Sequence, residues 1–124
     1  MHIQGSIAFT ITEHTPERVV ADMPIGAGIR NPFGSVHAGA ILWMADVAAT
    51  LLVLGPGEIT EGMQGFPLAI SLNANLLGNQ SEGAFQAIST FVKRGRTVSV
   101  VRTVVCGAAD KLIADITTSH VLSR

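Results

Sequence analysis

The chain contains few of the residues that identify several common kinds of protein. Cys106 is the only cysteine among 124 residues, so an intrachain disulfide is impossible and a zinc site would need mostly other ligands. Aromatic residues make up 5% and tyrosine is absent, which removes the stacking platform of a single-stranded nucleic-acid binder. Charged residues make up only 14%, and the net charge is −1. We therefore expect neither a disordered chain nor a strongly basic nucleic-acid binder.

What the chain does contain is apolar surface to bury. Hydrophobic residues make up 48% of it, and the mean hydropathy is +0.44. We expect one domain spanning residues 1–124, because two separate cores would each lie near the lower size limit for folding alone. The low charge also indicates that part of the surface is hidden in an oligomer. Residues 1–5 lack the basic and then apolar pattern of a signal peptide, so we expect a cytoplasmic protein.

The longest apolar run, residues 36–54, contains only three polar side chains, those of His37, Asp46 and Thr50. The run is long enough to cross a bilayer, but an Asp near the bilayer centre is costly. It is rich in Ala and Leu, which favour helix, and a Gly-Pro pair ends it. We therefore expect a helix that is buried by the rest of the protein, with no membrane partner.

Segments rich in β-branched and aromatic residues flank this helix on both sides. Two precede it, at residues 3–12 and 18–24, and four follow it, at residues 68–77, 84–93, 97–106 and 112–122. Residues 57–65 are polar and glycine-rich and are interpreted as a connection. Because an apolar helix must be covered, we expect an α+β fold in which a curved antiparallel sheet of five or six strands wraps around it. Pairing two such sheets edge to edge would protect exposed strands.

The segment at residues 68–77 has the clearest strand pattern. Its apolar and polar side chains alternate, which predicts a strand with one apolar face.

Asp46 is the most informative single residue, because the residues on both sides of it in the predicted helix are apolar. A buried carboxylate is costly, so such a group is usually paired, hydrogen-bonded or used. One interpretation is an Asp that faces the surface at a helix kink. The other is a general base or nucleophile in a dry cleft.

The start of the helix is the second candidate. Backbone N–H groups there lack partners, and the helix macrodipole makes this end positive. Such an end can hold an anion or a developing oxyanion, and the N–H groups of Ala38 and Gly39 are the candidate donors. The alternative is a flexible loop that leads into a helix.

The spacing of the two candidates restricts how they can act together. Gly39 and Asp46 are seven residues apart and Ala38 and Asp46 are eight apart, which is roughly 10–12 Å along a helix. One carbonyl group cannot touch both. If both serve one reaction, the donor comes from one subunit and the carboxylate from another, so we predict a composite site across a dimer interface.

The pattern Asn-x-x-Gly-x-x-His-x-Gly at residues 31–39, with Asp46 in the following helix, resembles the signature of the hotdog-fold acyl-CoA thioesterases. The most similar branch is the phenylacetyl-CoA thioesterase-like (PaaI-type) group. Residues 93–100 resemble the penultimate hairpin of that family, and the order of strands and helix matches over nearly the whole chain. The resemblance implies a hotdog fold and hydrolysis of an acyl-CoA thioester, and it leaves the acyl group open.

By position, the resemblance also implies roles for single residues. Asp46 matches the carboxylate that activates water or attacks the thioester, and the helix-start amide of Ala38, with Gly39 beside it, matches the oxyanion donor. The residues that match positions contacting the thioester or placing water are Asn31, His37 and Ser71. The family usually has glycine where Ala38 stands. This change keeps the N–H group, but the added methyl narrows the thioester slot.

His37 has three interpretations: a hydrogen-bond donor to the carbonyl oxygen, a residue that holds the loop, or a helix cap. The histidines His2, His14 and His120 have no metal-ligand spacing with it. We therefore predict no metal, and no cofactor apart from the coenzyme A of the substrate. Trp43 fits a core or interface position better than an acyl pocket, for which Phe33 and Phe66 are further candidates.

Half of the eight Lys and Arg residues lie close together in the sequence, at Lys93, Arg94, Arg96 and Arg102. Arg suits phosphate oxygens geometrically, so we predict that Lys93, Arg94 and Arg96, which surround a turn, bind the phosphates of coenzyme A. The alternative is a solvated turn that protects a sheet edge.

Two other functions stay open beside hydrolysis of an acyl-CoA by a homodimer or a dimer of dimers. A hotdog hydratase or dehydratase would need His37 and Asp46 to converge on one substrate, which again requires two subunits. A non-catalytic module that binds acyl-CoA would tolerate the replacement of glycine by Ala38.

Overall fold

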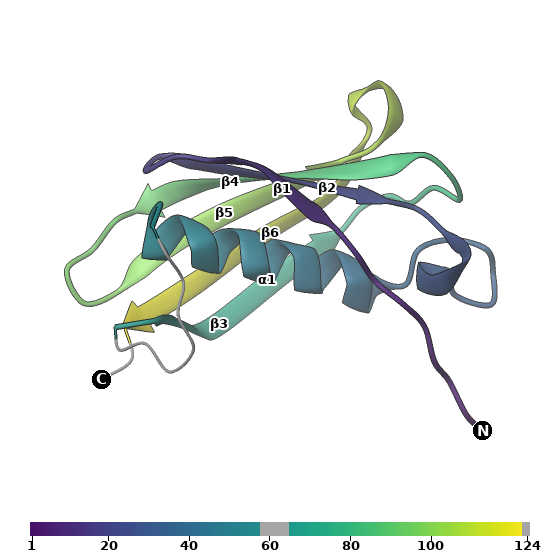
Figure 1. Cartoon of the computed structure of the whole chain (residues 1–124), viewed down its shortest axis with the longest axis horizontal. Coiled ribbons are helices and arrows are strands. Elements are labelled where there is room, and N and C mark those ends of the chain that lie inside the picture. Colours follow the sequence, from purple (N-terminus) through teal and green to yellow (C-terminus); the bar gives the residue numbers. More distant parts are fainter. Residues whose placement is uncertain (58–64, 123–124) are drawn as a thin grey trace.

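The fold is a six-stranded antiparallel sheet that curves around one long helix (Figure 1). The computed structural model describes residues 1–57 and 65–122. Its elements are β1 (Thr10–His14), β2 (Arg18–Pro24), the short 3-10 helix η1 (Ala27–Ile29), α1 (Ala38–Leu54), β3 (Pro67–Leu76), β4 (Ala84–Lys93), β5 (Ser99–Cys106), the 3-10 helix η2 (Ala108–Asp110) and β6 (Leu112–Leu122). The predicted α+β architecture is confirmed.

The strand order in the sheet is β1-β2-β4-β5-β6-β3. Sequential strands are neighbours except on either side of β3: α1 carries the chain from β2 to β3, which pairs with the last strand, β6, and the chain then returns from β3 to β4, which pairs with β2. Strands β1 and β3 therefore form the two edges of the sheet, and α1 crosses its concave face (Figure 1).

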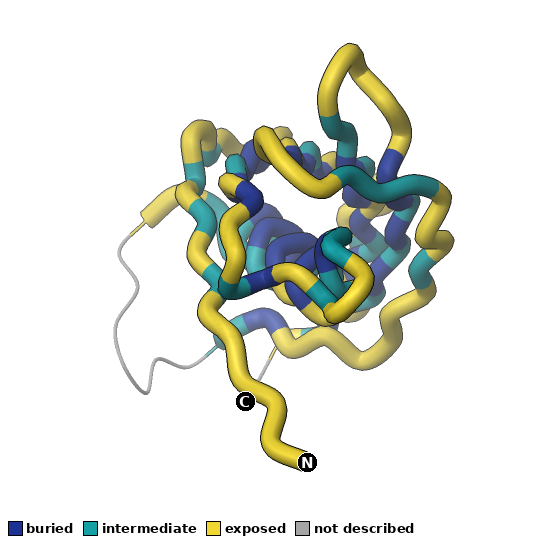
Figure 2. The backbone as a smooth tube through the Cα atoms, turned by 90° about the vertical axis from the view of Figure 1, so that its right-hand side faces the viewer, coloured by how far each residue is buried: buried dark blue, intermediate teal, exposed yellow. Residues whose placement is uncertain are grey.

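Helix α1 turns an alanine-rich face toward the sheet, and these small side chains let the two layers pack closely. The buried helix residues are Ala40, Ile41, Met44, Ala45, Ala48, Ala49 and Leu52. They share one core with large side chains of β2, β4, β5 and β6, among them Met23, Phe85, Val101, Val105, Ile113 and Ile116. Each buried Ile, Leu or Met contributes about 1.5–3 kcal/mol. Figure 2 shows this buried backbone at the centre, enclosed by exposed turns.

The edge strand β3 carries apolar side chains that no described part of the chain covers. The predicted apolar face includes Leu68, Ile70, Leu72 and Leu76, which are between 42% and 59% exposed. Their strand offers an unpaired edge at the same place. An exposed edge with apolar side chains is a template for pairing with another strand.

The structure corrects two predicted boundaries. The first strand begins at Thr10 rather than at residue 3, because residues 3–9 pair with no described strand and instead follow η1, where Ser6 N–H donates to Gly28 O at 3.0 Å. The helix begins at Ala38 rather than at residue 36, because Val36 forms an isolated bridge with Arg30.

The remaining boundaries agree closely with those predicted. The strands predicted at 18–24, 84–93 and 112–122 have these bounds, whereas β5 begins two residues later than predicted. In residues 1–57 and 65–122, no helix combines the length and hydropathy that a bilayer crossing requires. Most of the loop predicted at 57–65, namely residues 58–64, lies outside the described residues.

Candidate functional site

The loop before α1 is shaped by the side chain of Asn31. Its Oδ1 accepts hydrogen bonds from the backbone N–H groups of Phe33 (2.9 Å) and Ser35 (3.3 Å), and its Nδ2 donates to Ser35 Oγ at 3.0 Å. Asn and Asp side chains commonly stabilise turns in this way. The geometry therefore places Asn31 as an organiser of the loop.

A second asparagine fixes the other end of this loop. Asn79, in the turn after β3, donates from Nδ2 to Val36 O at 2.8 Å and accepts from Val36 N–H at 3.1 Å. This pair of bonds sets the direction in which the chain enters α1. The sequence analysis did not identify Asn79, and no local pattern signals a contact that joins residues 43 positions apart.

His37 is the N-cap of α1. Its Nδ1 accepts a hydrogen bond from Ala40 N–H at 3.1 Å, so a neutral ring carries its proton on Nε2. A Cβ at Gly39 would lie 3.1 Å from that Nδ1. Glycine at position 39 therefore leaves room for the capping ring.

The N–H groups of Ala38 and Gly39 lie at the exposed tip of the helix. Within the described part of the chain, no acceptor is hydrogen-bonded to either group. Unpaired amides at the positive end of a helix are suited to hold an oxyanion. These two N–H groups therefore remain the candidate donors predicted at this tip.

Asp46 lies in the middle of α1, and its helix runs without a break from Ala38 to Leu54. Its half-buried side chain borders a hollow of about 310 Å³, whose other lining residues are Val47, Thr50, Leu51 and Phe66. Within the described residues, neither ion pair of the structure involves Asp46. The carboxylate therefore faces a mostly apolar space, and no cationic side chain of the described residues forms an ion pair with it.

The other residues predicted for the site or its acyl pocket do not all line this hollow. Ser71 is exposed on β3 and is not part of the lining. Trp43 packs edge-to-face against Phe9 with ring centroids 4.7 Å apart, and Phe33 is 92% exposed. Of the three aromatic candidates for an acyl pocket, only Phe66 lines the hollow beside Asp46.

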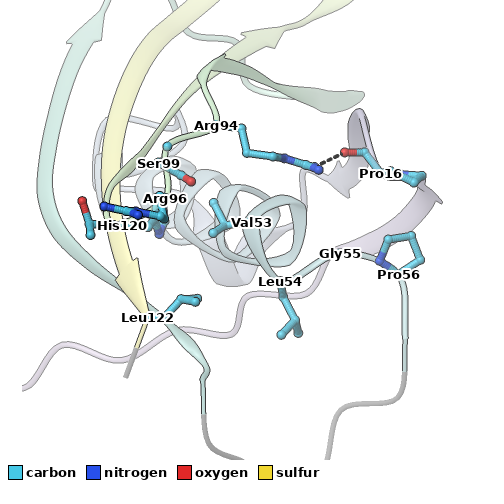
Figure 3. A pocket seen from close by; sticks show the side chains of 12 residues that line it. Pro16, Val53, Leu54, Gly55, Pro56, Arg94, Arg96, Ser99, His120 and Leu122 are labelled. Carbon is cyan, nitrogen blue, oxygen red and sulfur yellow. Dashed lines mark hydrogen bonds between the residues drawn. The ribbon is translucent and has the colours of Figure 1, made fainter. Parts of the chain in front are cut away.

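A cavity of about 350 Å³, larger than the hollow beside Asp46, lies at the C-terminal end of α1. It is bounded by the helix, the β4–β5 hairpin and β6 (Figure 3). Arg94 and Arg96 line it. Arg94 also donates to Pro16 O at 2.6 Å and lies over the ring of Phe91, 4.3 Å from its centroid. Lys93 is exposed at the end of β4, beside the cavity rather than in its lining.

Arg102 does not belong to this group, although it is close to it in sequence. It forms a bidentate ion pair with Asp115 across β5 and β6: Nη2 donates to Oδ2 at 2.7 Å, and Nε donates to Oδ1 at 3.0 Å. Hydrogen bonding to the Arg102 guanidinium lowers the pKa of the Asp115 carboxyl, and the same bond raises the pKa of Arg102. The basic cluster seen in the sequence is therefore two separate features.

His120 lines the cavity as well, and the sequence analysis gave it no role. The ring is buried, and Nε2 lies 2.8 Å from Thr118 Oγ1. Burial lowers the pKa of His120, while the negative charge of Asp46 opposes this shift in part. The sequence could have indicated that His120 is buried, because Ile116, Thr118 and His120 occupy alternate positions that share the buried face of β6.

Comparisons with known proteins agree with this architecture. The family model described as "Domain of unknown function (DUF4442)" matches residues 3–67. "Putative esterase ComA2" of Bacillus subtilis is 32% identical over 108 residues, which cover 87% of this chain and 83% of the relative. The 1,4-dihydroxy-2-naphthoyl-CoA hydrolase of Listeria monocytogenes is 23% identical, over 91% of this chain and 89% of its own length.

A solved structure, a mutant of thioesterase enzyme SAV0944 from Staphylococcus aureus, superposes with a TM-score of 0.84 at 22% identity. The match covers 94% of this chain and 93% of that one, so the two chains share a fold.

Proposed function

The chain belongs to the DUF4442 family and to the hotdog-fold acyl-CoA thioesterases, and from that premise we propose that it hydrolyses an acyl-CoA thioester to a free acid and coenzyme A. The observation that carries the proposal is the placement of Asp46 without a cation in a mostly apolar hollow, on the same helix as two unpaired amides. Asp46 can supply a base or nucleophile, and the two amides can supply an oxyanion hole.

The site is completed by a second copy of the chain. Within one α1, the amides of Ala38 and Gly39 lie roughly 10–12 Å from Asp46 along the axis. The exposed edge of β3 supports pairing with another β3 about a two-fold axis. Such pairing sets the two helices side by side in opposite directions, so that the tip of one approaches the middle of the other. We propose a homodimer, which pairs further into a dimer of dimers.

Two chemical routes share this geometry. In the first, Asp46 takes a proton from water, and the water oxygen attacks the thioester carbonyl. The partner's helix-start amides hold the oxyanion, and the C–S bond then breaks to release the thiolate, which takes up the proton. In the second, the Asp46 carboxylate attacks the carbonyl and expels the thiolate, and water then hydrolyses the mixed anhydride. A single turnover in heavy-oxygen water tests for the second route, because label enters Asp46 only when water attacks the Asp46 carbonyl of the mixed anhydride.

The arginines of the β4–β5 hairpin, with Lys93 beside them, are proposed to bind the phosphates of coenzyme A. Their support is the position of Arg94 and Arg96 on the wall of a cavity and the fit of guanidinium groups to phosphate oxygens. We place the enzyme in the cytoplasm, where a lone thiol such as Cys106 stays reduced.

The test is Asp46→Asn, assayed on aromatic, short-chain and long-chain acyl-CoAs with a thiol reagent. We expect kcat to fall by about 10²–10⁴-fold, the usual contribution of a general base. Asp110→Asn is the matched control, because Asp110 is exposed and its φ of 58° suits Asn. Full activity of Asp46→Asn would end the proposal. Binding of acyl-CoA without any turnover would indicate a binding module instead, and hydration of crotonyl-CoA a hydratase.

A further inference from the structure

A cavity separate from the two described above lies beside the N-terminal tip of α1, and we call it the tip cavity. Its volume is about 410 Å³, within the range of roughly 300–1,000 Å³ for small-molecule sites. It is lined by residues 3–5, by Gly28 of η1 and by the loop before α1, including Arg30, Asn31 and His37. Because His37 is also the N-cap of α1, the tip cavity adjoins the proposed oxyanion hole.

Close backbone contacts hold the N-terminal wall of the tip cavity in place. Ser6 N–H donates to Gly28 O at 3.0 Å, which fastens the N-terminal segment to η1. A Cβ at Gly5 would collide with the same oxygen, and a Cβ at Gly28 would collide with Ser6 Oγ. Glycine at both positions allows this close approach of the two backbones. The tip cavity is therefore bounded by anchored chain.

Arg30 supplies positive charge to the tip cavity, and no Asp or Glu is among the described residues that line it. Its Nε donates to Ser81 O at 2.9 Å, which anchors the guanidinium. Elsewhere in residues 1–57 and 65–122, no acceptor is bonded to its Nη1 or Nη2 group, and neither ion pair involves Arg30. An anchored guanidinium with both NH2 groups free is suited to bind a carboxylate through two parallel hydrogen bonds.

The proposed reaction leaves one part of the substrate for the tip cavity. The thioester carbon carries an oxygen, a sulfur and the acyl chain. The oxygen is proposed to bind the amides of Ala38 and Gly39. The sulfur leads to coenzyme A, whose phosphates are proposed to bind Arg94 and Arg96. The acyl chain is therefore the part that can enter a cavity beside the tip.

Resting on the proposed function, we propose that the tip cavity binds the far end of the acyl chain, that this end carries a carboxylate, and that Arg30 pairs with it. The substrate class is then the coenzyme A monothioesters of dicarboxylic acids. Arg30 is a specificity-determining residue, because the carboxylate that it binds takes no part in bond breaking. The chain that supplies the helix tip also supplies Arg30, whereas Asp46 comes from the partner.

The first experiment compares adipyl-CoA with hexanoyl-CoA, whose acyl chains are equally long but end in a carboxylate and a methyl group. We expect the parent protein to have the higher kcat/KM for adipyl-CoA. Arg30→Gln should lower the ratio of the two kcat/KM values by about tenfold, the lower end for a hydrogen bond to a charged group, because Arg30 is exposed. The ratio in the parent should also fall as salt rises.

The matched control is Arg18→Gln. Arg18 is an exposed arginine outside the tip cavity, paired with Glu13, so its substitution should keep the ratio of the parent. The rate of spontaneous hydrolysis without protein is subtracted for each substrate. A parent protein with no preference for adipyl-CoA would overturn the inference.

The use of a ratio separates substrate recognition from loop structure. Arg30→Gln also disturbs the bond to Ser81, but a purely structural loss would slow both substrates alike and leave the ratio unchanged. Such a result would overturn the inference. Arg30→Lys keeps the charge without the planar fork, so its ratio should lie between those of the parent and Arg30→Gln. Arg30→Glu should reverse the preference, so that 6-aminohexanoyl-CoA is hydrolysed faster than adipyl-CoA, and an unchanged order would contradict the pairing.

Mixed dimers test which chain supplies Arg30. Ala38→Pro removes one tip amide and Asp46→Asn removes the carboxylate, so we expect each variant alone to be nearly inactive. In their mixture, the active site combines Asp46 of the first chain with the tip of the second. Adding Arg30→Gln to the Asp46→Asn chain should lower the ratio, whereas adding it to the Ala38→Pro chain should not. The opposite result would contradict the assignment.

Failure of this inference is distinguishable from failure of the proposed function. If Asp46→Asn abolishes hydrolysis of hexanoyl-CoA while Arg30→Gln keeps the ratio of the parent, only this inference fails. If Asp46→Asn stays active on both substrates, the proposed function fails instead.

Discussion

The two ends of α1 present different kinds of candidate functional group. At the N-terminal tip the candidate groups are backbone amides, held in place by the side chains of Asn31, His37 and Asn79. At the other end the candidate groups are side chains, those of Arg94, Arg96 and His120, around a cavity. The helix has 17 residues, so its ends are roughly 25 Å apart. If both groups serve one reaction, as proposed, one chain carries two halves of a site that it cannot bring together alone.

The difference between the ends predicts how each responds to substitution. A site made of amides tolerates changes of side chain but not the loss of an N–H group. A site made of side chains is sensitive to each of them separately. The predictions below test this contrast, beginning with the largest expected effect.

Ala38→Pro removes one N–H group at the tip and leaves the helix intact. Proline is well tolerated at the first helical position, and His37 already has the extended conformation, with φ −70° and ψ 146°, that a residue before proline requires. We expect kcat to fall by about 10²–10³-fold, as when an oxyanion donor is lost. Ala38→Gly keeps the N–H group and serves as the matched control, with kcat unchanged or higher. A normal kcat for Ala38→Pro would remove this amide from the site.

The same variant tests the composite site when it is mixed with Asp46→Asn. Each variant alone is nearly inactive, but a mixed dimer contains one site with an intact Asp46 and an intact partner tip. Random exchange should therefore restore about a quarter of the parent activity, because about half of the dimers are mixed and each has one working site. No recovery after verified subunit exchange would contradict a site shared between chains.

The sequence predicted best those features that depend on local pattern. Strand β4 lies between two turns, and α1 is rich in Ala and Leu and ends at a Gly-Pro pair, so both ends of β4 and the end of the helix were predicted correctly. Residues 3–9 have the composition of a strand but no neighbour to pair with. Pairing is decided by distant parts of the chain, so composition alone could not place the start of β1.

In the candidate site too, local features could be predicted from sequence and features that depend on distant residues could not. Asp46 and the tip amides could be found from sequence, because a carboxylate in an apolar run and a helix start are local features. Asn79 acts on a residue 43 positions away, and the cavity around His120 is formed by several elements. For Arg102 the sequence misled in the opposite way. Its closeness in sequence to Arg94 and Arg96 placed it in one basic cluster with them, although its partner is Asp115 on another strand.

The arginines test the side-chain end of the helix. We expect Arg96→Ala to raise the KM for acyl-CoA by about 10- to 100-fold, because a hydrogen bond to a charged group contributes about 1.5–3 kcal/mol. Arg102→Ala is the matched control: it removes the same side chain from the ion pair with Asp115 and should leave the KM unchanged. Binding is measured at two salt concentrations, since phosphate contacts weaken as salt rises. Equal effects of the two substitutions would restore the single basic cluster suggested by the sequence.

The smallest expected effect concerns the pH dependence of stability at the same end. Burial places the pKa of His120 in the folded protein below its ordinary value of about 6.5. The unfolded chain therefore binds a proton more readily, so the contribution of the neutral ring to stability is full above pH 6.5 and declines as the pH falls below it. We expect the Tm to decrease between pH 7.5 and 5, and to decrease less in His120→Leu. His2→Leu should follow the parent protein, because its ring is exposed. Identical pH profiles for His120→Leu and the parent would show that the ring of His120 does not resist protonation, and would make this end of the helix more open to water than its burial indicates.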